Sequence, residues 1–300
     1  MAYNINELDT RLKNYLETNG TEVLTKALFN SESAKYFQIQ TGVTAETPII
    51  RLDSSITLAD ASTCGFEATG SDTFSNRLLS PKFLKVNKEI CAKTLLKTWA
   101  HSDVRMNALG ETLPFEELLI NNNINELAKV NERLIWEGDT TSGSGNMLLM
   151  DGIITIAKKD ENTVKQEKGT DTIWQRVQKI WLALPAEIAD KATIFMSIAN
   201  YKALIVELMN ANNFHVFEEY QGTYEMTMPG ANVKIKGVSG ITSDVILATP
   251  EDNLYLGVDG ESDDETVDLY FDKSSRTFKF VVEYAYAVQY AFSEFVYINQ

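Results

Sequence analysis

The sequence predicts an α+β fold with one long helix, an extended two-stranded arm, a compact mixed unit and a long C-terminal strand. Residues 114–137 repeat apolar side chains at helical spacing. Residues 170–254 alternate helix-type and strand-type segments, and residues 278–292 place a large apolar side chain at every second position. Because helices and strands occupy separate stretches around these landmarks, we expect an α+β architecture.

The composition narrows the class of protein. The chain has 300 residues, 44% of them hydrophobic, which is enough for a sizeable core. It contains no apolar run of the roughly 18 to 20 residues that cross a bilayer and no signal-peptide pattern at its start, so we expect a cytosolic protein without a membrane partner. Cys64 and Cys91 are too few for a disulfide framework and are not spaced as zinc ligands. A net charge of −15 argues against binding nucleic acid through a basic face.

The N-terminal part divides into a helical and an irregular stretch. Leu8, Leu12 and Leu16 recur at helical spacing and predict helix within residues 1–30. Residues 36–75 are rich in Gly, Thr and Ser and predict a long irregular connection. Connections of that length are usually functional or interfacial.

A basic segment follows. Residues 73–95 alternate apolar residues with lysines, which predicts a two-stranded arm with Ser80 and Pro81 near its tip. Residues 71–100 hold six basic and two acidic residues, a net charge of +4, whereas residues 201–300 hold six basic and sixteen acidic residues, a net charge of −10. An isolated hairpin is marginal in water, and opposite charges suit contacts between copies of the chain, although ordinary variation in surface charge is the alternative. The candidate contact residues here are Arg77, Lys82, Lys85 and Lys88.

Residues 114–137 are the clearest helix. Pro114 suits the first turn, and Glu116 and Glu117 follow where the helix dipole favours negative charge. The apolar stripe consists of Ile120, Ile124, Leu127 and Leu134. At 1.5 Å per residue, this helix is a rod roughly 35 Å long.

The glycine-rich stretch "GDTTSGSG" leaves this helix. It lacks the Lys-Ser/Thr pair of a phosphate loop and the G-x-S-x-G spacing of a nucleophile elbow, and a helix C-terminus repels anions. We expect a flexible turn in which Gly138 is a left-handed cap. Gly138, Gly143 and Gly145 are candidates for a subunit contact, and valine at 143 and 145 is expected to impair assembly more than folding.

The remaining segments predict a compact unit and a long strand. The expected elements are a polar hairpin at 158–168, helices at 173–189 and 199–209, and strands at 192–197, 224–228, 233–238 and 245–248. The period-two run that starts at Phe278 is too long for one domain. Its parity changes after Phe292, which predicts a bulge near Ser293.

No constellation predicts catalysis, a metal site or a cofactor. Ser102 and Asp103 adjoin His101, but a triad is assembled across the fold and adjacent side chains rarely point at one another, while His215 is typical of a helix end. The acidic run 259–268 lacks the spacing of a calcium loop and predicts a solvated segment. Asp263 and Asp264 in this run are candidate contacts with a basic surface of another copy.

The order of these parts resembles the major capsid protein of tailed bacteriophages. The most specific pieces are "NERLIWEGDTTSGSGNMLLMDGIITIA" and the closing "DLYFDKSSRTFKFVVEYAYAVQYAFSEFVYIN", together with "CGFEATGSDTFSNRLLSPKFLKVNKEIC". The resemblance implies an N-terminal arm (1–45), an irregular lead (46–72), an E-loop (73–100), a peripheral domain (101–169 and 276–300) with a spine helix (114–137), and an axial domain (170–275).

The resemblance also implies a function. It implies a subunit that self-assembles into hexamers and pentamers of an icosahedral head around double-stranded DNA, assembled in the host cytoplasm, with portal, scaffolding and decoration proteins as partners. The chain has no room for a long cleaved N-terminal segment, so a separate scaffolding protein is expected. Crosslinking through Lys82, Lys85 or Lys88 is a weaker hypothesis. The alternatives are an encapsulin-like shell for protein cargo and a cytosolic α/β hydrolase that uses His101 or His215.

Overall fold

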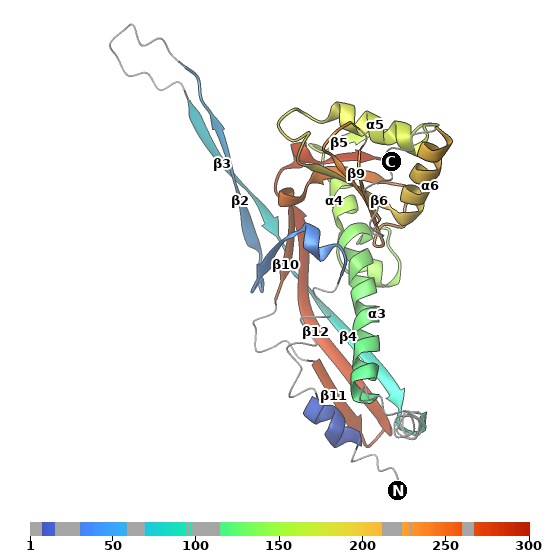
Figure 1. Cartoon of the computed structure of the whole chain (residues 1–300). Coiled ribbons are helices and arrows are strands. Elements are labelled where there is room, and N and C mark those ends of the chain that lie inside the picture. The colour runs from blue at the N-terminus through green and yellow to red at the C-terminus, as the bar shows by residue number, and fades with distance from the viewer. Residues whose placement is uncertain are drawn as a thin grey trace.

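The molecule is an elongated body from which a two-stranded arm projects, as a computed structural model shows (Figure 1). The structure describes residues 8–15, 31–58, 70–94, 97, 115–211, 224–228, 230–259 and 267–300. No helix within these ranges is long and apolar enough to cross a membrane. Helices and strands occur as separate elements, and the described strands form two large sheets and one two-stranded sheet, which confirms the α+β class.

The first sheet has five strands and forms the long half of the body. Its path is β1-β10-β12-β11, and β4 pairs with the opposite edge of β12. The strands are β1 (Gln38–Thr41), β4 (Lys82–Cys91), β10 (Leu254–Val258), β11 (Val267–Asp272) and β12 (Thr277–Tyr290). The central strand β12 therefore holds this half together.

The second sheet has six strands in the order β5-β13-β9-β6-β8-β7. The strands are β5 (Val164–Gln166), β6 (Ala192–Ser197), β7 (Glu225–Thr227), β8 (Lys234–Val238), β9 (Ile246–Pro250) and β13 (Tyr297–Asn299). Helices α5 (Ile173–Ala183) and α6 (Ile198–Asn210) contact each other and pack on this sheet. The strands and the helix predicted at 199–209 are confirmed within one or two residues at each end, whereas the helix predicted at 173–189 ends six residues early, just before Pro185.

The long helix α3 (Phe115–Glu137) has 23 residues. Its predicted stripe of Ile120, Ile124, Leu127 and Leu134 is buried in the core of the first sheet. Pro114 lies outside the described residues. The prediction of this helix is confirmed because its apolar face has a sheet to pack against.

Strand β12 has the predicted alternation. Its seven even-numbered residues from Phe278 to Tyr290 are buried, while Glu283 and Gln289 on the other face are only partly covered. A short 3-10 turn at Ser293–Phe295 then interrupts the strand, and β13 continues into the second sheet. The predicted break near Ser293 is confirmed. The C-terminal segment also contributes a strand to each of the two large sheets, as its length predicted.

The prediction of a hairpin within residues 73–95 is wrong. Strand β3 (Ser71–Leu79) pairs with β2 (Thr47–Ser55), and β4 pairs with β12. The arm is therefore the β2–β3 pair, and Ser80 and Pro81 lie at its base instead of its tip. Alternation in the sequence identified the strands, but it holds no information about which strand is the partner.

Two other local predictions are also wrong. Residues 36–75 are not irregular throughout, because they contain β1, β2 and part of β3. Residues 158–168 do not form a hairpin, since helix α4 (Ile153–Lys159) ends there and β5 pairs in parallel with β13. In both stretches a strand pairs with one that is distant in sequence, since β1 pairs with β10 and β5 with β13. The turn-forming residues of these stretches do not indicate such pairing.

The N-terminal helix is described only at residues 8–15. Leu8 and Leu12 are fully buried in the core of the first sheet, as the helical spacing predicted. The backbone N–H of Phe271 in β11 donates to Asp9 Oδ1 at 3.1 Å. This contact attaches the helix to the edge strand at the far end of the body. The predicted division of the chain into named domains stays a prediction.

Candidate functional site

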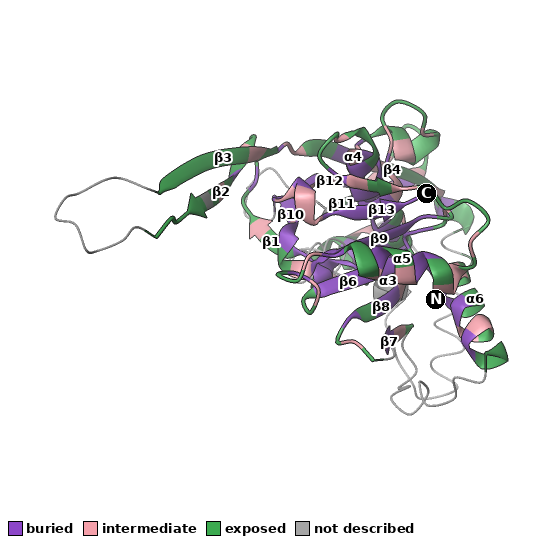
Figure 2. Cartoon of the chain, turned by 90° about the horizontal axis from the view of Figure 1, so that it is seen from above, coloured by how far each residue is buried: buried purple, intermediate pink, exposed green. Residues whose placement is uncertain are grey.

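One face of the arm is apolar and exposed. The register places Leu52 opposite Phe74 and Ile50 opposite Asn76, so even-numbered residues of both strands share a face. We define the outer face as Ile50, Leu52, Phe74 and Leu78. Ile50 is 75% exposed and Phe74 is 72% exposed, and Figure 2 shows both strands largely exposed along the arm. Exposed apolar strands invite pairing with another chain, so this face is a candidate binding surface.

The inner face of the arm is bound to the body by two arginines. Arg51 donates to Glu294 Oε2 at 2.9 Å, and its guanidinium lies 4.8 Å from the ring centre of Phe292. Arg77 donates to Asp160 Oδ2 at 2.7 Å and lies 4.4 Å from the ring centre of Tyr290. Both arginines contact the segment where β12 ends, so they set the direction in which the arm leaves the body.

The contact with Asp160 is electrostatically strong. Burial alone would raise the pKa of Asp160, but hydrogen bonds from Arg77, the Asn162 N–H and Tyr290 outweigh it and lower the pKa to about 2. Arg77, predicted as a contact with another copy, is therefore engaged within its own chain. Ile49 and Leu79 are buried next to it and complete the attachment of the arm.

The arm is not basic, contrary to the prediction. Strands β2 and β3 together hold two arginines, Arg51 and Arg77, and two acidic residues, Asp53 and Asp72, so their net charge is zero. The predicted lysines lie on β4, in the body. Lys82 is exposed there, Lys85 forms an ion pair with Glu283, and Lys88 donates to Asn123. The charge of +4 thus belongs to a surface of the body and does not travel with the arm.

The glycine-rich turn after α3 is closely packed. Gly138 is not left-handed, so the predicted cap is wrong. A Cβ on Gly138 would instead overlap the Met150 carbonyl oxygen, and one on Gly143 would overlap the Asp139 carbonyl oxygen. Of the three glycines predicted as contacts in this turn, Gly145 alone has a positive φ, of 57°. Valine at 143 would therefore disturb folding, and the expectation that assembly would suffer more stays a prediction.

Two carboxylates of the turn accept hydrogen bonds from backbone N–H groups of the same turn. Asp139 accepts from the Thr141 N–H at 2.8 Å, and Asp151 accepts from the Thr140 N–H at 2.8 Å. The hydrogen bonds of Ser142 and Thr141 lower the pKa of Asp139 to about 2. Because two carboxylates already accept from these donors, their negative charge disfavours binding of a phosphate at this turn.

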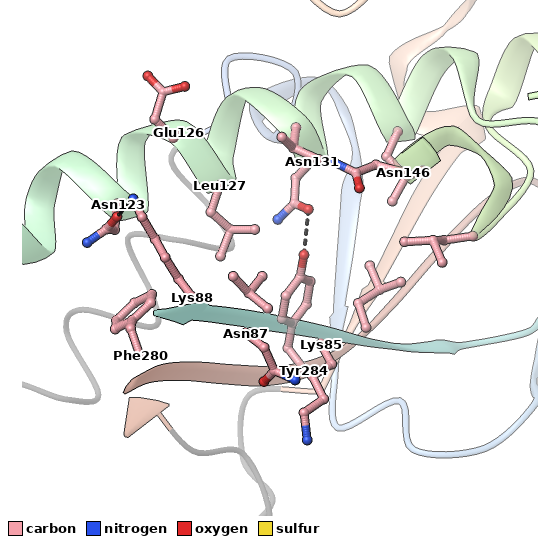
Figure 3. Close-up of a pocket in the computed structure, with 15 residues that line it drawn as sticks. Lys85, Asn87, Lys88, Asn123, Glu126, Leu127, Asn131, Asn146, Phe280 and Tyr284 are labelled. Atoms are coloured by element: carbon pink, nitrogen blue, oxygen red, sulfur yellow. Dashed lines mark hydrogen bonds between the residues drawn. The ribbon is translucent and has the colours of Figure 1, made fainter. Parts of the chain in front are cut away.

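A groove of about 360 Å³ lies between α3 and the β4–β12 pair (Figure 3). We call it the groove. Its apolar lining includes Leu84, Leu127, Leu134 and Phe280. Asn131 on α3 lies at its floor, fully buried, and its Oδ1 accepts from the Tyr284 hydroxyl at 2.6 Å. Burial raises the pKa of Tyr284 to about 12, so the hydroxyl keeps the proton that it donates.

A second buried polar group on α3 holds the segment before β1. Glu132 accepts from the backbone N–H of Ser33 at 3.0 Å and from its hydroxyl, while Trp136 Nε1 donates to Ser33 Oγ at 2.6 Å. Burial raises the pKa of Glu132 despite the hydrogen bonds from Ser33. Sequence reasoning missed Asn131 and Glu132, although Asn131 lies four residues after Leu127 in the apolar stripe and was visible as a polar residue there.

Several predicted site residues lie outside the described residues, namely His101, His215, Asp263, Asp264 and Cys64. Cys91 is exposed at the end of β4. Among the residues that the structure describes, no group of His, Cys, Asp and Glu is arranged to bind a metal ion. The surfaces that stand out are therefore the arm, its attachment and the groove.

Comparisons of structure identify similar proteins, while no protein-family model and no curated protein matches the sequence. The satellite phage P4 procapsid has a chain that matches with a TM-score of 0.62 and 11% identity, over 93% of this chain and 98% of that one. The capsid of an empty GTA particle matches with a TM-score of 0.60 and 11% identity, over 90% and 89% of the two chains. A virus-like particle from Pyrococcus furiosus matches with a TM-score of 0.51 and 13% identity, over 93% and 96%.

These matches cover nearly the whole chain and not one subdomain. The similarity is one of fold, since identity is near 11%. The chain has the fold of phage capsid proteins, as the resemblance in sequence order implied.

Proposed function

We propose that this protein is a major capsid protein, a subunit that self-assembles into a closed shell. The observation that carries the proposal is the outer face of the arm, where Ile50, Leu52 and Phe74 are exposed on a chain with a capsid fold. A shell subunit needs an apolar surface that is exposed to water in the monomer and buried in the assembled shell. The outer face has this property, because its own body lies on the opposite, arginine-bearing side.

Burial of the outer face on a neighbouring copy would stabilise the shell. Complete burial of one large apolar side chain is worth about 1.5 to 3 kcal/mol. The face and its acceptor surface are different parts of the chain, so the contact is heterologous and repeats around an axis to close rings. We propose hexamers and pentamers as those rings, and the arm as the E-loop of the shell.

The charge of the chain supports a container for DNA without sequence-specific binding. A net charge of −15 disfavours tight contacts with phosphates, which would hinder packaging and release. Portal, scaffolding and decoration proteins are further proposed partners, with assembly in the host cytoplasm and residence in the virion. The similar P4 procapsid includes a size determination protein, which illustrates a helper subunit in that particle.

A shell that encloses protein cargo is the second candidate. The similarity to the Pyrococcus furiosus virus-like particle, over 93% of this chain, favours keeping it. Such a shell would use the same contacts between subunits and differ in contents. Nucleic acid in particles purified after nuclease treatment supports the viral head, and co-purifying protein without nucleic acid supports the cargo shell. We propose no catalytic role for the chain.

The test is assembly of the purified protein, followed by negative-stain microscopy and analytical ultracentrifugation. The wild-type protein is expected to form shells, tubes or rings. The variant Ile50→Ser/Leu52→Ser/Phe74→Ser is expected to remain monomeric with an unchanged unfolding midpoint. The matched control, Thr73→Ala/Ser75→Ala, alters the opposite face of the arm and is expected to assemble. A wild-type protein that stays monomeric at high concentration would contradict the proposal.

A further inference from the structure

A short buried segment lies between the second sheet and α3. We call residues 31–37, which precede β1, the wedge. The ring of Tyr36 is centred 5.5 Å from the ring of Phe195 in β6. The ring of Phe37 is centred 5.7 Å from that of Trp136 on α3, and both aromatic residues of the wedge are buried. Because β1 belongs to the first sheet, the wedge contacts the second sheet and the long helix just before the chain enters the first sheet.

One carboxyl group on α3 anchors the wedge. Glu132 is 4% exposed, and it accepts from the Ser33 N–H at 3.0 Å and from the Ser33 hydroxyl. The same hydroxyl oxygen accepts from Trp136 Nε1 at 2.6 Å. A neutral carboxyl group would keep an acceptor for the Ser33 N–H and would gain a donor for the Ser33 oxygen, so these contacts are compatible with both protonation states.

The surroundings of Glu132 oppose its ionisation. Burial raises the pKa of Glu132 above its usual value of 4.5, and the hydrogen bonds from Ser33 and the Gly240 N–H offset this only in part. The carboxylate of Glu32, in the wedge, raises the pKa of Glu132 further. On β12, burial raises the pKa of Tyr286, so this hydroxyl keeps its proton and supplies no opposite charge.

The basic residues around the wedge are either paired with other carboxylates or exposed. The pairs are Lys129 with Glu126, Arg133 with Glu137 and Lys236 with Glu251. Lys35, in the wedge itself, is exposed. Within the described residues, no basic side chain forms an ion pair with Glu132. Glu132 also lines a cavity of about 700 Å³ beside the wedge, through which water can exchange its proton.

We propose that the wedge is a proton-sensitive latch, which stays docked between α3 and the second sheet while Glu132 is neutral and is released more often when Glu132 is ionised. An ionised carboxylate that is buried beside Glu32 costs free energy, and undocking returns it to water. In the undocked state the pKa of Glu132 returns toward 4.5. Docking is therefore strongest below about pH 4.5 and weakens as the pH rises through the higher pKa of the docked state.

The test is hydrogen–deuterium exchange of the wedge, followed by mass spectrometry of the full chain from about pH 5 to 9. The wild-type exchange rate is divided by the rate of Glu132→Gln at each pH, which removes the intrinsic pH dependence of exchange. Because glutamine does not ionise, this ratio is expected to rise with pH, by up to about 10-fold per pH unit, and then to level off. A ratio that is independent of pH overturns the proposal.

The matched control is Glu126→Gln. This carboxylate is on the same helix, but its side chain is 63% exposed and paired with Lys129. The rate of this variant divided by the wild-type rate is expected to be the same at every pH, because the neutralised group does not contact the wedge. A pH-dependent ratio in this control would assign the effect to the net charge of α3, and the role of Glu132 would fail.

Ser33→Ala separates proton sensitivity from simple loosening, and it decides the question if Glu132→Gln does not fold. The hydroxyl of Ser33 lowers the pKa of Glu132, so its removal raises the docked-state pKa and extends release to higher pH. The rate of Ser33→Ala divided by the wild-type rate is therefore expected to increase with pH. An equal increase at every pH would show that Ser33 only holds the wedge in place, and the latch would be refuted. The latch does not depend on the proposed shell function, so either can fail alone.

Discussion

Strand β12 and the arm have the same alternating pattern and opposite surroundings. In β12 the even-numbered residues from Phe278 to Tyr290 are buried under α3 and the N-terminal segment. In the arm the even-numbered Ile50 and Phe74 lie on a face that its own chain does not cover. The apolar face of β12 is therefore buried within the monomer, whereas the apolar face of the arm is exposed. The difference teaches that a period-two pattern specifies an apolar face, while the presence of a covering element decides whether that face is core or interface.

The largest expected effect is a matched pair of phenylalanine substitutions. Phe278→Ala should lower the free energy of unfolding by about 3 to 5 kcal/mol, because it leaves a cavity in a closed core. Phe74→Ala should change it by less than about 0.5 kcal/mol, since the ring is already exposed in the monomer. Chemical denaturation of the monomer measures both. An equal loss in the two variants would show that the arm is covered by its own chain and would remove the contrast.

Arg77→Ala tests the junction between the two regions. Loss of the hydrogen bond and the ring contact should lower stability by about 1 to 3 kcal/mol at neutral pH. The pKa of Asp160 is depressed to about 2, so its contribution is present above the unfolded-state value near 3.8 and disappears as the pH falls through about 2. The gap between wild type and variant should therefore narrow below about pH 4. A gap that is independent of pH would assign the effect to packing alone.

Gly257→Ala is expected to have a smaller effect at the same junction. A Cβ on Gly257 of β10 would lie 2.7 Å from Leu79 Cδ2, the last residue of the arm to be buried in the body. We expect a loss of about 1 kcal/mol, because the leucine must move. In a double-mutant cycle, Leu79→Ala should relieve part of this loss, so the two substitutions should be less than additive. Strict additivity would mean that Leu79 does not limit the space at Gly257.

The smallest expected effect is at an ion pair on the odd-numbered face of β12. Lys85 and Glu283 form an ion pair whose side chains are 55% and 45% exposed. Glu283→Gln should therefore change the unfolding free energy by no more than about 1 kcal/mol, and less at high salt. Thermal unfolding at low and high ionic strength measures this. A loss comparable to that of Phe278→Ala would contradict the surface character of this ion pair.

The long helix and the C-terminal strand were predictable because their signals are local. Apolar spacing identified α3 almost to the residue, and the parity change located the break at Ser293. The arm was only half predicted. Alternation indicated β3 and β4, but β3 pairs with β2 across a connection whose glycines and threonines suggested an irregular segment. Strand pairing depends on residues far apart in the chain, and no spacing rule reports it.

The candidate site shows the same division. Lys88 was chosen for its charge, but its hydrogen bond to Asn123 forms only because α3 packs on β4. Arg77 was chosen as a contact with another copy, and the fold uses it to attach the arm to Asp160. Gly138 was assigned a left-handed backbone, whereas its actual constraint is the close approach of Met150.

By itself, the sequence determined the types of the main elements, the apolar faces they carry and the α+β class, since these follow from the spacing of neighbouring residues. The tertiary structure decided which faces are covered, which strand pairs with β3 and which charges remain unpaired. The physical reason is that burial and pairing arise between segments distant in sequence. The outer face of the arm could be identified as uncovered only in the folded chain, because its exposure depends on where the rest of the chain lies.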